Sequence, residues 1–440
     1  MRVPATILGS VFLAGLAGPA LADPIEILFV GNSFTHGRYP PALNYNAGSA
    51  TSTGTAVVHD LLSATAAENP SPNQNPSANP PAAFAGLTLQ QKLTYLQNNP
   101  SAQYTEQGPF SGAAGLFLQF TKEAGLNYDV SLVAVSSATL KGYLNGSNSG
   151  DLPLIAQSKW NNVVLQDQSF TPLPSSITVN GQSVPTRGNP ANFQAGVGGL
   201  VSAIDTADGN ASKPYANITL YETPPLAAYG YTSTNPNQPI FGSSTVASQN
   251  GNKAYAPYVG DANPDAAMAS DLHNAYYGEA AAVNALGQSA VNVAPSGDAW
   301  ITAINAGIAE ADPYLVNEPP GQIDLWDSDP IDACCTTPIG YHPSAAGDYL
   351  NALVLFEEIT GVNPLTLTAE FNPANTNSAA YAMGLSPVTA FELAEAAAVT
   401  VADAGPANAI PEPASLALLA AVLLGSAIVR RRDPSPHAGQ

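Results

Sequence analysis

Two short segments, far apart in the chain, carry residues that could act on an ester carbonyl. EILFVGNSFTHG begins at Glu26 and places Ser33 directly after an apolar run, and GYHPSAAGDYL places His342 just before an apolar helical pattern. A serine hydroxyl is a weak nucleophile unless a nearby base takes its proton, and imidazole has a suitable pKa near neutral pH. The two segments therefore indicate nucleophilic catalysis if the fold brings them together. The alternative for Ser33 is an ordinary helix N-cap.

The elements that would position these residues follow an alternating pattern. Continuous apolar runs typical of strands buried on both faces alternate with longer helical patterns, which favours a parallel sheet between two layers of helices. We expect a flavodoxin-like three-layer α/β/α sandwich with a five-stranded parallel sheet. The strand candidates lie at 25–31, 128–137, 161–169, 217–225 and 289–297, and the helix candidates at 113–125, 192–207, 264–287, 297–311 and 344–361.

This topology predicts where a ligand would bind. In open α/β sheets the site lies at the carboxyl ends of the strands. Ser33 follows the first predicted strand, the QDQS segment follows the third, and the loop carrying His342 opens at the same edge. We therefore expect Ser33 and His342 to meet there.

The motifs resemble those of a known family. GNSFT and YHPSAAGDYL look like blocks I and V of the SGNH (GDSL-like) hydrolases, and VVLQDQS looks like block III of the subgroup in which Gln replaces Asn. The resemblance spans roughly residues 25–364. It implies that Ser33 is the nucleophile, that His342 is the general base, and that the backbone N–H of Ser33 is one oxyanion donor.

The same resemblance implies the other oxyanion donors. Gln168 matches the block III side chain, with Gln166 as the fallback if the register is shifted by two. The second block should supply a glycine within SSATLKG, but none stands at the expected position. Ser137 or Ala138 would then have to offer its backbone N–H.

The acid of the triad departs from the family pattern. The family places Asp three residues before the histidine, where this chain has Ile339. We expect Asp332, or else Asp329, to reach the imidazole from a rearranged loop, stiffened by a bond between the adjacent Cys334 and Cys335. The alternatives are a Ser-His dyad or an orienting backbone carbonyl.

Two further residues near the nucleophile are candidates for substrate binding. Asn32 and His36 flank Ser33 and are expected to lie on the same rim. For His36 a solvated surface position is the favoured alternative. We also expect His59, beside Asp60, at the surface, and His273 in a structural position within a helix.

The sequence gives little support for cofactors or nucleic acid. The histidines are scattered and the CC pair lacks zinc-ligand spacing, so we expect no metal site. VGNSFTHG lacks the Lys of a phosphate-binding loop. A net charge of −21 disfavours nucleic acid, because phosphate binding needs Lys and Arg, and it favours neutral or cationic partners.

Both ends of the chain carry targeting signals. Residues 1–22 read as a secretory signal peptide. Residues 411–432 join a Pro-Glu-Pro segment to an apolar run and three arginines, and this order resembles the PEP-CTERM sorting signal of Gram-negative bacteria. The resemblance implies an inner-membrane anchor, processing by an exosortase, and a cytoplasmic tail at 433–440. The protein is then held in the inner membrane and later released to the cell surface or extracellular matrix.

Between these signals we expect one catalytic domain at 23–365, with loop insertions at about 64–85 and 225–263. The second insertion is rich in tyrosine and could form either a sugar platform or a surface flap. Residues 366–410 read as an edge element and a spacer. The favoured function is an exported serine esterase that deacetylates a polysaccharide or cleaves a small ester. The rival is a non-catalytic glycan-binding or matrix protein that retains the fold.

Overall fold

The computed structural model describes residues 23–39, 41–63, 108–231, 257–286, 289–313, 320–327 and 340–404. Several predictions therefore fall outside the described residues: the signal peptide, most of both loop insertions, Asp329, Asp332, Ile339, the cysteine pair and the C-terminal sorting signal. Within the described ranges no helix is both long and apolar enough to cross a membrane.

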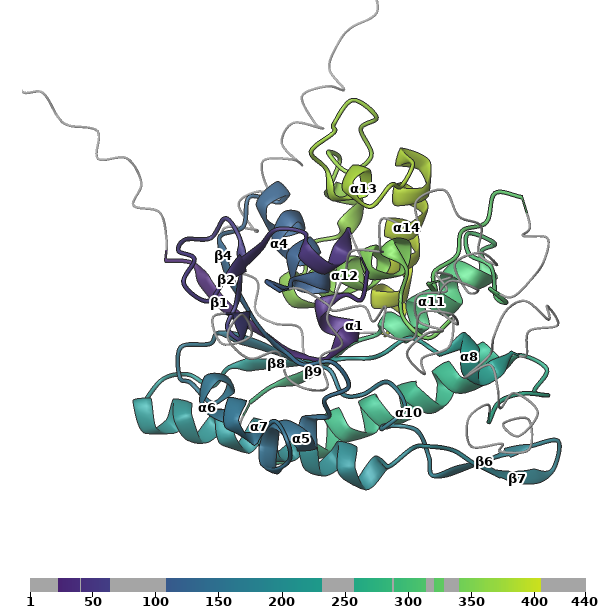
Figure 1. The fold of residues 1–440 in the computed structure, drawn as a ribbon, viewed down its shortest axis with the longest axis horizontal. Coiled ribbons are helices and arrows are strands. Elements are labelled where there is room, and N and C mark those ends of the chain that lie inside the picture. The colour runs from purple at the N-terminus through teal and green to yellow at the C-terminus, as the bar shows by residue number, and fades with distance from the viewer. Residues whose placement is uncertain are drawn as a thin grey trace, which may run out of the picture.

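A seven-stranded parallel sheet forms the centre of the described structure, in the order β2-β3-β4-β1-β5-β8-β9. Figure 1 shows this sheet between layers of helices. The five predicted strands form as expected. They are β1 (Ile25–Gly31), β4 (Tyr128–Ala134), β5 (Asn162–Leu165), β8 (Asn217–Tyr221) and β9 (Val291–Ala294).

The predicted strand count was wrong, because two short strands extend one edge of the sheet. β2 (Ala47–Ser49) pairs with β3 (Val58–Asp60), which in turn pairs with β4. Their sequences, AGS and VHD, are three residues long and contain neither an apolar run nor a clear alternation. Neither strand therefore gives the pattern by which a buried strand is recognised. A separate antiparallel hairpin joins β6 (Ser176–Val179) to β7 (Gln182–Pro185).

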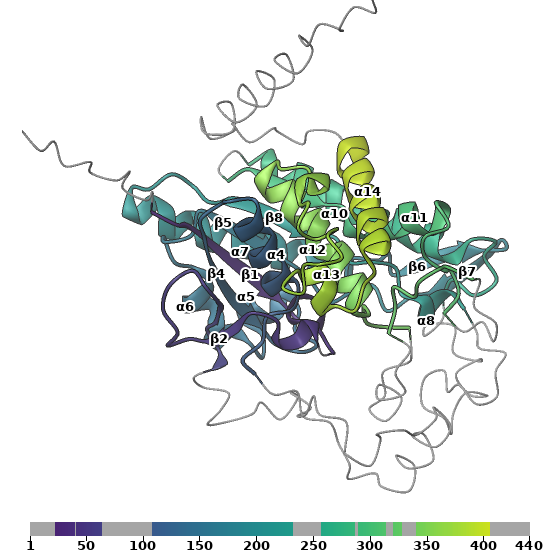
Figure 2. The ribbon, with the colours of Figure 1, turned by 90° about the horizontal axis from the view of Figure 1, so that it is seen from above.

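Helices cover both faces of the sheet, which confirms the predicted α/β/α sandwich (Figures 1 and 2). Phe29 of β1 packs into the core on one face, while Leu28 and Val30 pack into the core on the other. The first face carries α4 (Gly112–Glu123), α11 (Ser296–Asn305) and α12 (Ala345–Thr360). The second carries α5 (Leu140–Asn145), α7 (Pro190–Ala211) and α10 (Pro264–Asn284).

The packed domain extends beyond the predicted boundary at residue 365. Helix α14 (Pro387–Ala404) contacts α11 and α12, and its Leu393 and Ala397 are fully buried in the same core (Figure 2). The segment predicted as an edge element and spacer is thus part of the helical layer up to Ala404. The other described elements are four short α-helices, α1 (Ser33–His36), α6 (Leu152–Ile155), α8 (Ala227–Gly230) and α13 (Ala379–Ala382), and three 3₁₀ helices, η1 (Ala42–Asn44), η3 (Ser149–Asp151) and η6 (Pro364–Thr366).

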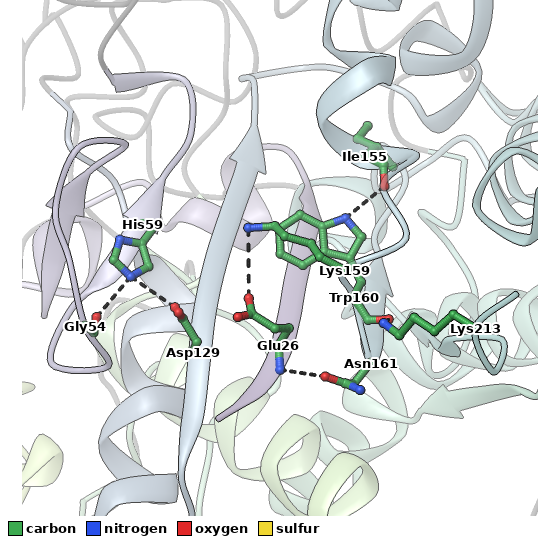
Figure 3. A network of polar contacts seen from close by, with 9 residues as sticks. All are labelled: Glu26, Gly54, His59, Asp129, Ile155, Lys159, Trp160, Asn161 and Lys213. Carbon is green, nitrogen blue, oxygen red and sulfur yellow. Dashed lines mark hydrogen bonds and ion pairs between the residues drawn. The ribbon is translucent and has the colours of Figure 1, made fainter. Parts of the chain in front are cut away.

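Polar contacts tie the strands together near their amino ends (Figure 3). The Glu26 N–H donates to Asn161 Oδ1 at 2.9 Å, and Lys159 Nζ lies 3.9 Å from Glu26 Oε2. Lys213 Nζ donates to the carbonyl oxygen of Trp160, whose indole N–H donates to Ile155. These contacts fix the ends of β1 and β5 at the edge opposite Ser33.

His59 lies in the same region, and its predicted surface position was wrong. Its side chain is buried, and Nε2 lies 3.0 Å from Asp129 Oδ1 and 3.0 Å from the carbonyl oxygen of Gly54 (Figure 3). The partner is therefore Asp129 of the neighbouring strand β4. Asp60, its neighbour in sequence, instead accepts the backbone N–H groups of Leu62 and Phe110.

Candidate active site

The nucleophile candidate lies at a tight junction between β1 and α1. Asn32 caps α1, with its side-chain oxygen accepting the Phe34 N–H at 3.1 Å. Ser33 is the first helical residue and is 6% exposed. Its Oγ lies 2.9 Å from His342 Nε2. The two residues on which the catalytic prediction depends are thus within hydrogen-bonding distance.

Aromatic rings and a helix cap hold His342 in place. Its ring centroid lies 5.3 Å from that of Phe34 and 5.0 Å from that of Tyr341. Two residues later, Ser344 caps α12 by accepting the Gly347 N–H, and its own N–H donates to Leu325. The imidazole is 5% exposed, so its position is set by packing on the protein side.

Gln166, the first residue after β5, braces the nucleophile loop. Its Oε1 accepts the Asn32 N–H at 2.9 Å and the Thr35 hydroxyl at 2.8 Å, and its Nε2 donates to the carbonyl oxygen of Asp167. Gln166 is fully buried. Because its amide is already used on both sides, it holds the loop and is not placed as an oxyanion donor.

The close approach of the Gln166 side chain to the end of β1 explains why a glycine, Gly31, stands there. A Cβ at Gly31 would stand 2.1 Å from Thr35 Oγ1 and 2.6 Å from Gln166 Oε1, distances that real Cβ atoms do not reach. Only glycine lets the glutamine carbonyl reach the loop that carries Ser33.

The candidate oxyanion donors differ in how far their hydrogen-bonding groups are already used. The Ala138 N–H donates to Val135 at 3.0 Å, so it is engaged within its own turn. Ser137 has φ +64°, a left-handed conformation that favours glycine, and it stands where the family pattern expects one. Among the described residues, the backbone N–H groups of Ser33 and Ser137 and the side-chain amide of Gln168 make no hydrogen bond. These three groups remain the candidates, and Ala138 is disfavoured.

Asp167 links the two loops that carry these donors. Its Oδ1 accepts the Gln168 N–H at 2.7 Å and the Leu140 N–H at 3.1 Å. Burial raises the pKa of Asp167 to about 7, although the two amide hydrogen bonds oppose the rise. This buried carboxyl therefore titrates near neutral pH beside the candidate site, and no sequence motif indicates it.

Asn32 and His36 make contacts that stabilise the segments around Ser33. Besides capping α1, Asn32 donates from Nδ2 to the Ala138 carbonyl at 3.0 Å. The solvated position favoured for His36 was wrong, because the ring is buried and stacks on Phe110 with centroids 4.7 Å apart. His36 Nδ1 lies 2.5 Å from the Gly37 carbonyl oxygen, and Nε2 lies 3.1 Å from Ser136 Oγ. It thus connects α1 to the turn that contains Ser137.

Another aspartate lies opposite His342. Trp326 and Pro343 form an antiparallel bridge, and the Asp327 N–H donates to the His342 carbonyl oxygen at 2.8 Å. Directly opposed residues of an antiparallel pair carry their side chains on the same face, with Cβ atoms about 5 Å apart. Asp332, the residue expected from the sequence, lies outside the described residues.

Comparison with known proteins identifies one motif. Residues 409–432 match the PEP-CTERM protein-sorting motif, as expected from the C-terminal sequence. This motif is the recognition signal for exosortase, and it indicates an exported protein with a membrane-anchoring sorting signal. No curated protein matches the sequence significantly.

Solved structures show distant similarity. A DUF4886 family protein from Bacteroides uniformis is 12% identical with a TM-score of 0.41, and the match covers 86% of this chain and 95% of that one. A proposed SGNH hydrolase from Slackia heliotrinireducens is 16% identical with a TM-score of 0.32, covering 77% and 100%. Phospholipase A1 from Streptomyces albidoflavus is 14% identical with a TM-score of 0.29, covering 76% and 99%. At these values the similarity gives no information on activity.

Proposed function

We propose that the protein is an exported serine esterase with Ser33 as the nucleophile and His342 as the general base. The main observation in support of this proposal is the 2.9 Å contact between Ser33 Oγ and His342 Nε2. The contact joins Ser33, the first residue of α1, to an imidazole held by packing, which is the geometry that serine activation requires.

The reaction proceeds in two halves. Ser33 Oγ bonds to the ester carbonyl carbon while His342 Nε2 takes the hydroxyl proton, and the tetrahedral oxyanion accepts the Ser33 and Ser137 N–H groups and the Gln168 amide. When the bond from carbon to the alcohol oxygen breaks, His342 passes its proton to the leaving alcohol. Water then attacks the acyl-serine carbon and gives a proton to His342. Collapse returns that proton to Ser33 and releases the carboxylic acid.

We assign the orientation of the His342 imidazole to Asp327, since Asp327 lies directly opposite it in the antiparallel bridge. A carboxylate at the second ring nitrogen fixes the tautomer and stabilises the imidazolium that forms. Asp332 is the competing candidate, and variants at the two positions separate them.

Acetyl esters on a neutral polysaccharide are the proposed substrates. A net charge of −21 repels anionic substrates, so neutral acetylated sugars fit better than acidic lipids or acidic glycans. The sorting motif supports this proposal, since it indicates export and such polymers lie outside the cytoplasm. After processing, the cell surface or extracellular matrix is the proposed destination.

Hydrolysis of p-nitrophenyl acetate tests the catalytic pair. Ser33→Ala and His342→Ala should each abolish turnover above background. Ser289→Ala is the matched control, because Ser289 is also buried and donates its hydroxyl to a carboxylate, that of Asp205, away from the site. It should retain activity.

The same assay distinguishes the rival function. If the folded wild-type chain shows no turnover but binds a glycan, the protein is a non-catalytic binding protein and the esterase proposal fails. Acetate release from an acetylated neutral polysaccharide, compared with an acidic one at low and high salt, tests the substrate class.

A further inference from the structure

Three side chains capable of binding a metal converge next to the strand β8, on the opposite side of β5 from the nucleophile. Glu222 follows β8 directly, His273 lies in the middle of α10, and Asp298 lies in the first turn of α11. One ligand atom from each lies within 4.8 Å of the other two. The three residues are far apart in sequence and form no metal-binding motif, so the sequence did not predict this cluster.

The environment of the Glu222 carboxyl indicates that a ligand binds at this cluster. It is fully buried, and within the described residues neither carboxylate oxygen makes a hydrogen bond. Burial raises the pKa of Glu222 well above its usual range, and the neighbouring Asp298 carboxylate raises it further. The Gly297 and Asp298 amides lie near enough to oppose the rise, without forming well-aligned hydrogen bonds. An unsatisfied buried carboxyl is costly unless something compensates it.

The start of α11 is shaped around this carboxyl. A Cβ at Gly297 would stand 3.3 Å from Glu222 Cδ and 2.8 Å from the Thr223 carbonyl oxygen. Glycine therefore lets the helix N-terminus approach the buried glutamate closely. Asp298, the next residue, is brought toward the same point from the same turn.

His273 and Asp298 meet beside Glu222 at a hydrogen-bonding distance. His273 Nδ1 lies 2.7 Å from Asp298 Oδ2, and the side chains are 40% and 30% exposed. Two donor atoms bound tetrahedrally at about 2.1 Å stand about 3.4 Å apart, so these two side chains would separate slightly on binding an ion. The ring is held by stacking on Tyr277, with centroids 4.1 Å apart. A plain His–Asp ion pair would explain these two residues but not the buried carboxyl beside them.

We propose that Glu222, His273 and Asp298 bind a divalent transition-metal ion of the zinc type. One imidazole nitrogen and two carboxylates form a three-ligand set that suits Zn²⁺, with water completing a tetrahedral site. A charge of +2 balances the two carboxylates, of which Glu222 is fully buried. The ion joins β8, α10 and α11. It is separated from Ser33 by the strand β5, so its role is to fix these elements rather than to act on the ester.

Zinc binding by the full chain tests the proposal. After dialysis against Zn²⁺, elemental analysis should find one ion per wild-type chain, and calorimetric titration should give a matching stoichiometry. Glu222→Gln keeps the shape of the side chain and removes its charge, so the variant should fold. It should bind Zn²⁺ at least about 10- to 100-fold more weakly, because the loss of a ligand costs no less than the loss of an outer-shell partner.

A matched pair elsewhere in the molecule provides the control. His59 and Asp129 lie 3.0 Å apart in an equivalent ion pair, but the described residues offer them no third ligand (Figure 3). His59→Asn should leave zinc binding unchanged, whereas His273→Asn should weaken it. Zinc should also raise the melting temperature of the wild type and not that of Glu222→Gln.

Two outcomes would overturn the proposal. One is equal zinc affinity in the wild type and Glu222→Gln. The other is binding that persists in Glu222→Gln and disappears in a Cys334→Ser, Cys335→Ser variant, which would assign the ion to the cysteines.

Discussion

In the proposed mechanism, the hydrogen bond to Ser33 positions Nε2 of His342 as the base. The group that faces the other ring nitrogen, Nδ1, then sets how readily the imidazole accepts the serine proton. Asp327 lies across the antiparallel bridge from His342. We expect Asp327→Asn to lower kcat by up to about 10⁴-fold by fixing the wrong tautomer, as loss of an orienting acid can do in a triad. The pH profile of kcat should change with it, since the imidazolium loses its carboxylate partner.

Asp332→Asn is the companion variant. If Asp327 orients the ring, this variant keeps both kcat and its pH profile close to wild type. The reverse pattern would assign the role to Asp332, and two active variants would indicate a Ser-His dyad.

Asp167 carries a separate prediction about stability. Its pKa is raised to about 7 in the folded chain, above its ordinary value near 4. The stability that it contributes is therefore complete below pH 4 and is lost as pH rises through 7. Asp167→Asn keeps an oxygen for the Gln168 and Leu140 amides without the charge. The melting temperature of the variant relative to wild type should rise between pH 5 and pH 8. A constant difference across that range would show that Asp167 does not titrate there.

At the residue scale, the sequence predicted the proposed catalytic pair better than the groups that surround it. Ser33 and His342 stand in recognisable motifs beside strong strand and helix patterns. Gln166 and Gln168 lie two positions apart in the same loop, and only the path of the chain after Leu165 shows which one is buried against the nucleophile. Likewise, the burial of His36 depends on Phe110, which approaches from a distant segment.

At the element scale, long apolar patterns were predictable and short or alanine-rich ones were not. The five core strands and the helices α4, α7, α10, α11 and α12 have enough apolar residues to identify each element, whereas the six-residue α5 was not predicted. The edge strands β2 and β3 are held by pairing with β4, a long-range effect that their own three residues do not encode. Helix α14 lies in the segment predicted as an edge element and spacer, because its alanine-rich sequence gives no sign that it packs into the core.

The packing of α14 makes it a stabilising element. Leu393 is fully buried between α14 and its neighbours, while Val388 on the same helix is 66% exposed. Leu393→Ala should reduce the free energy of unfolding by about 2–5 kcal/mol, the range for truncation of a buried leucine. Val388→Ala is the control and should change it by less than about 0.5 kcal/mol. Denaturant titration measures both. Equal, small effects would mean that α14 is a peripheral appendage.

At the scale of the whole molecule, buried carboxyls dominate the electrostatics. Burial raises the pKa of Asp60 to about 6, of Asp265, Glu357 and Glu358 to about 7, and of Glu370 to about 8. Between pH 4 and 8 the folded chain therefore binds more protons than the unfolded chain. Stability then decreases as pH rises.

We expect the melting temperature to increase when the pH is lowered from 8 to 5 at constant ionic strength. The net charge of −21 acts in the same direction, because protonation relieves repulsion within the compact state. A scanning calorimetry series at several salt concentrations separates the two causes, since salt screens surface repulsion but not the titration of buried groups. A melting temperature that falls steadily over this range would contradict the prediction.

The separation of 309 positions along the chain between Ser33 and His342 also has a consequence for biosynthesis. Ser33, the proposed nucleophile, is synthesised early, whereas His342, the proposed base, lies near the end of the folded region. An incomplete nascent chain therefore carries the serine without the histidine. A polypeptide crossing the membrane amino end first would remain inert until most of it had emerged. Ester cleavage would then begin only in the compartment where the finished domain closes, leaving acyl groups inside the cell untouched.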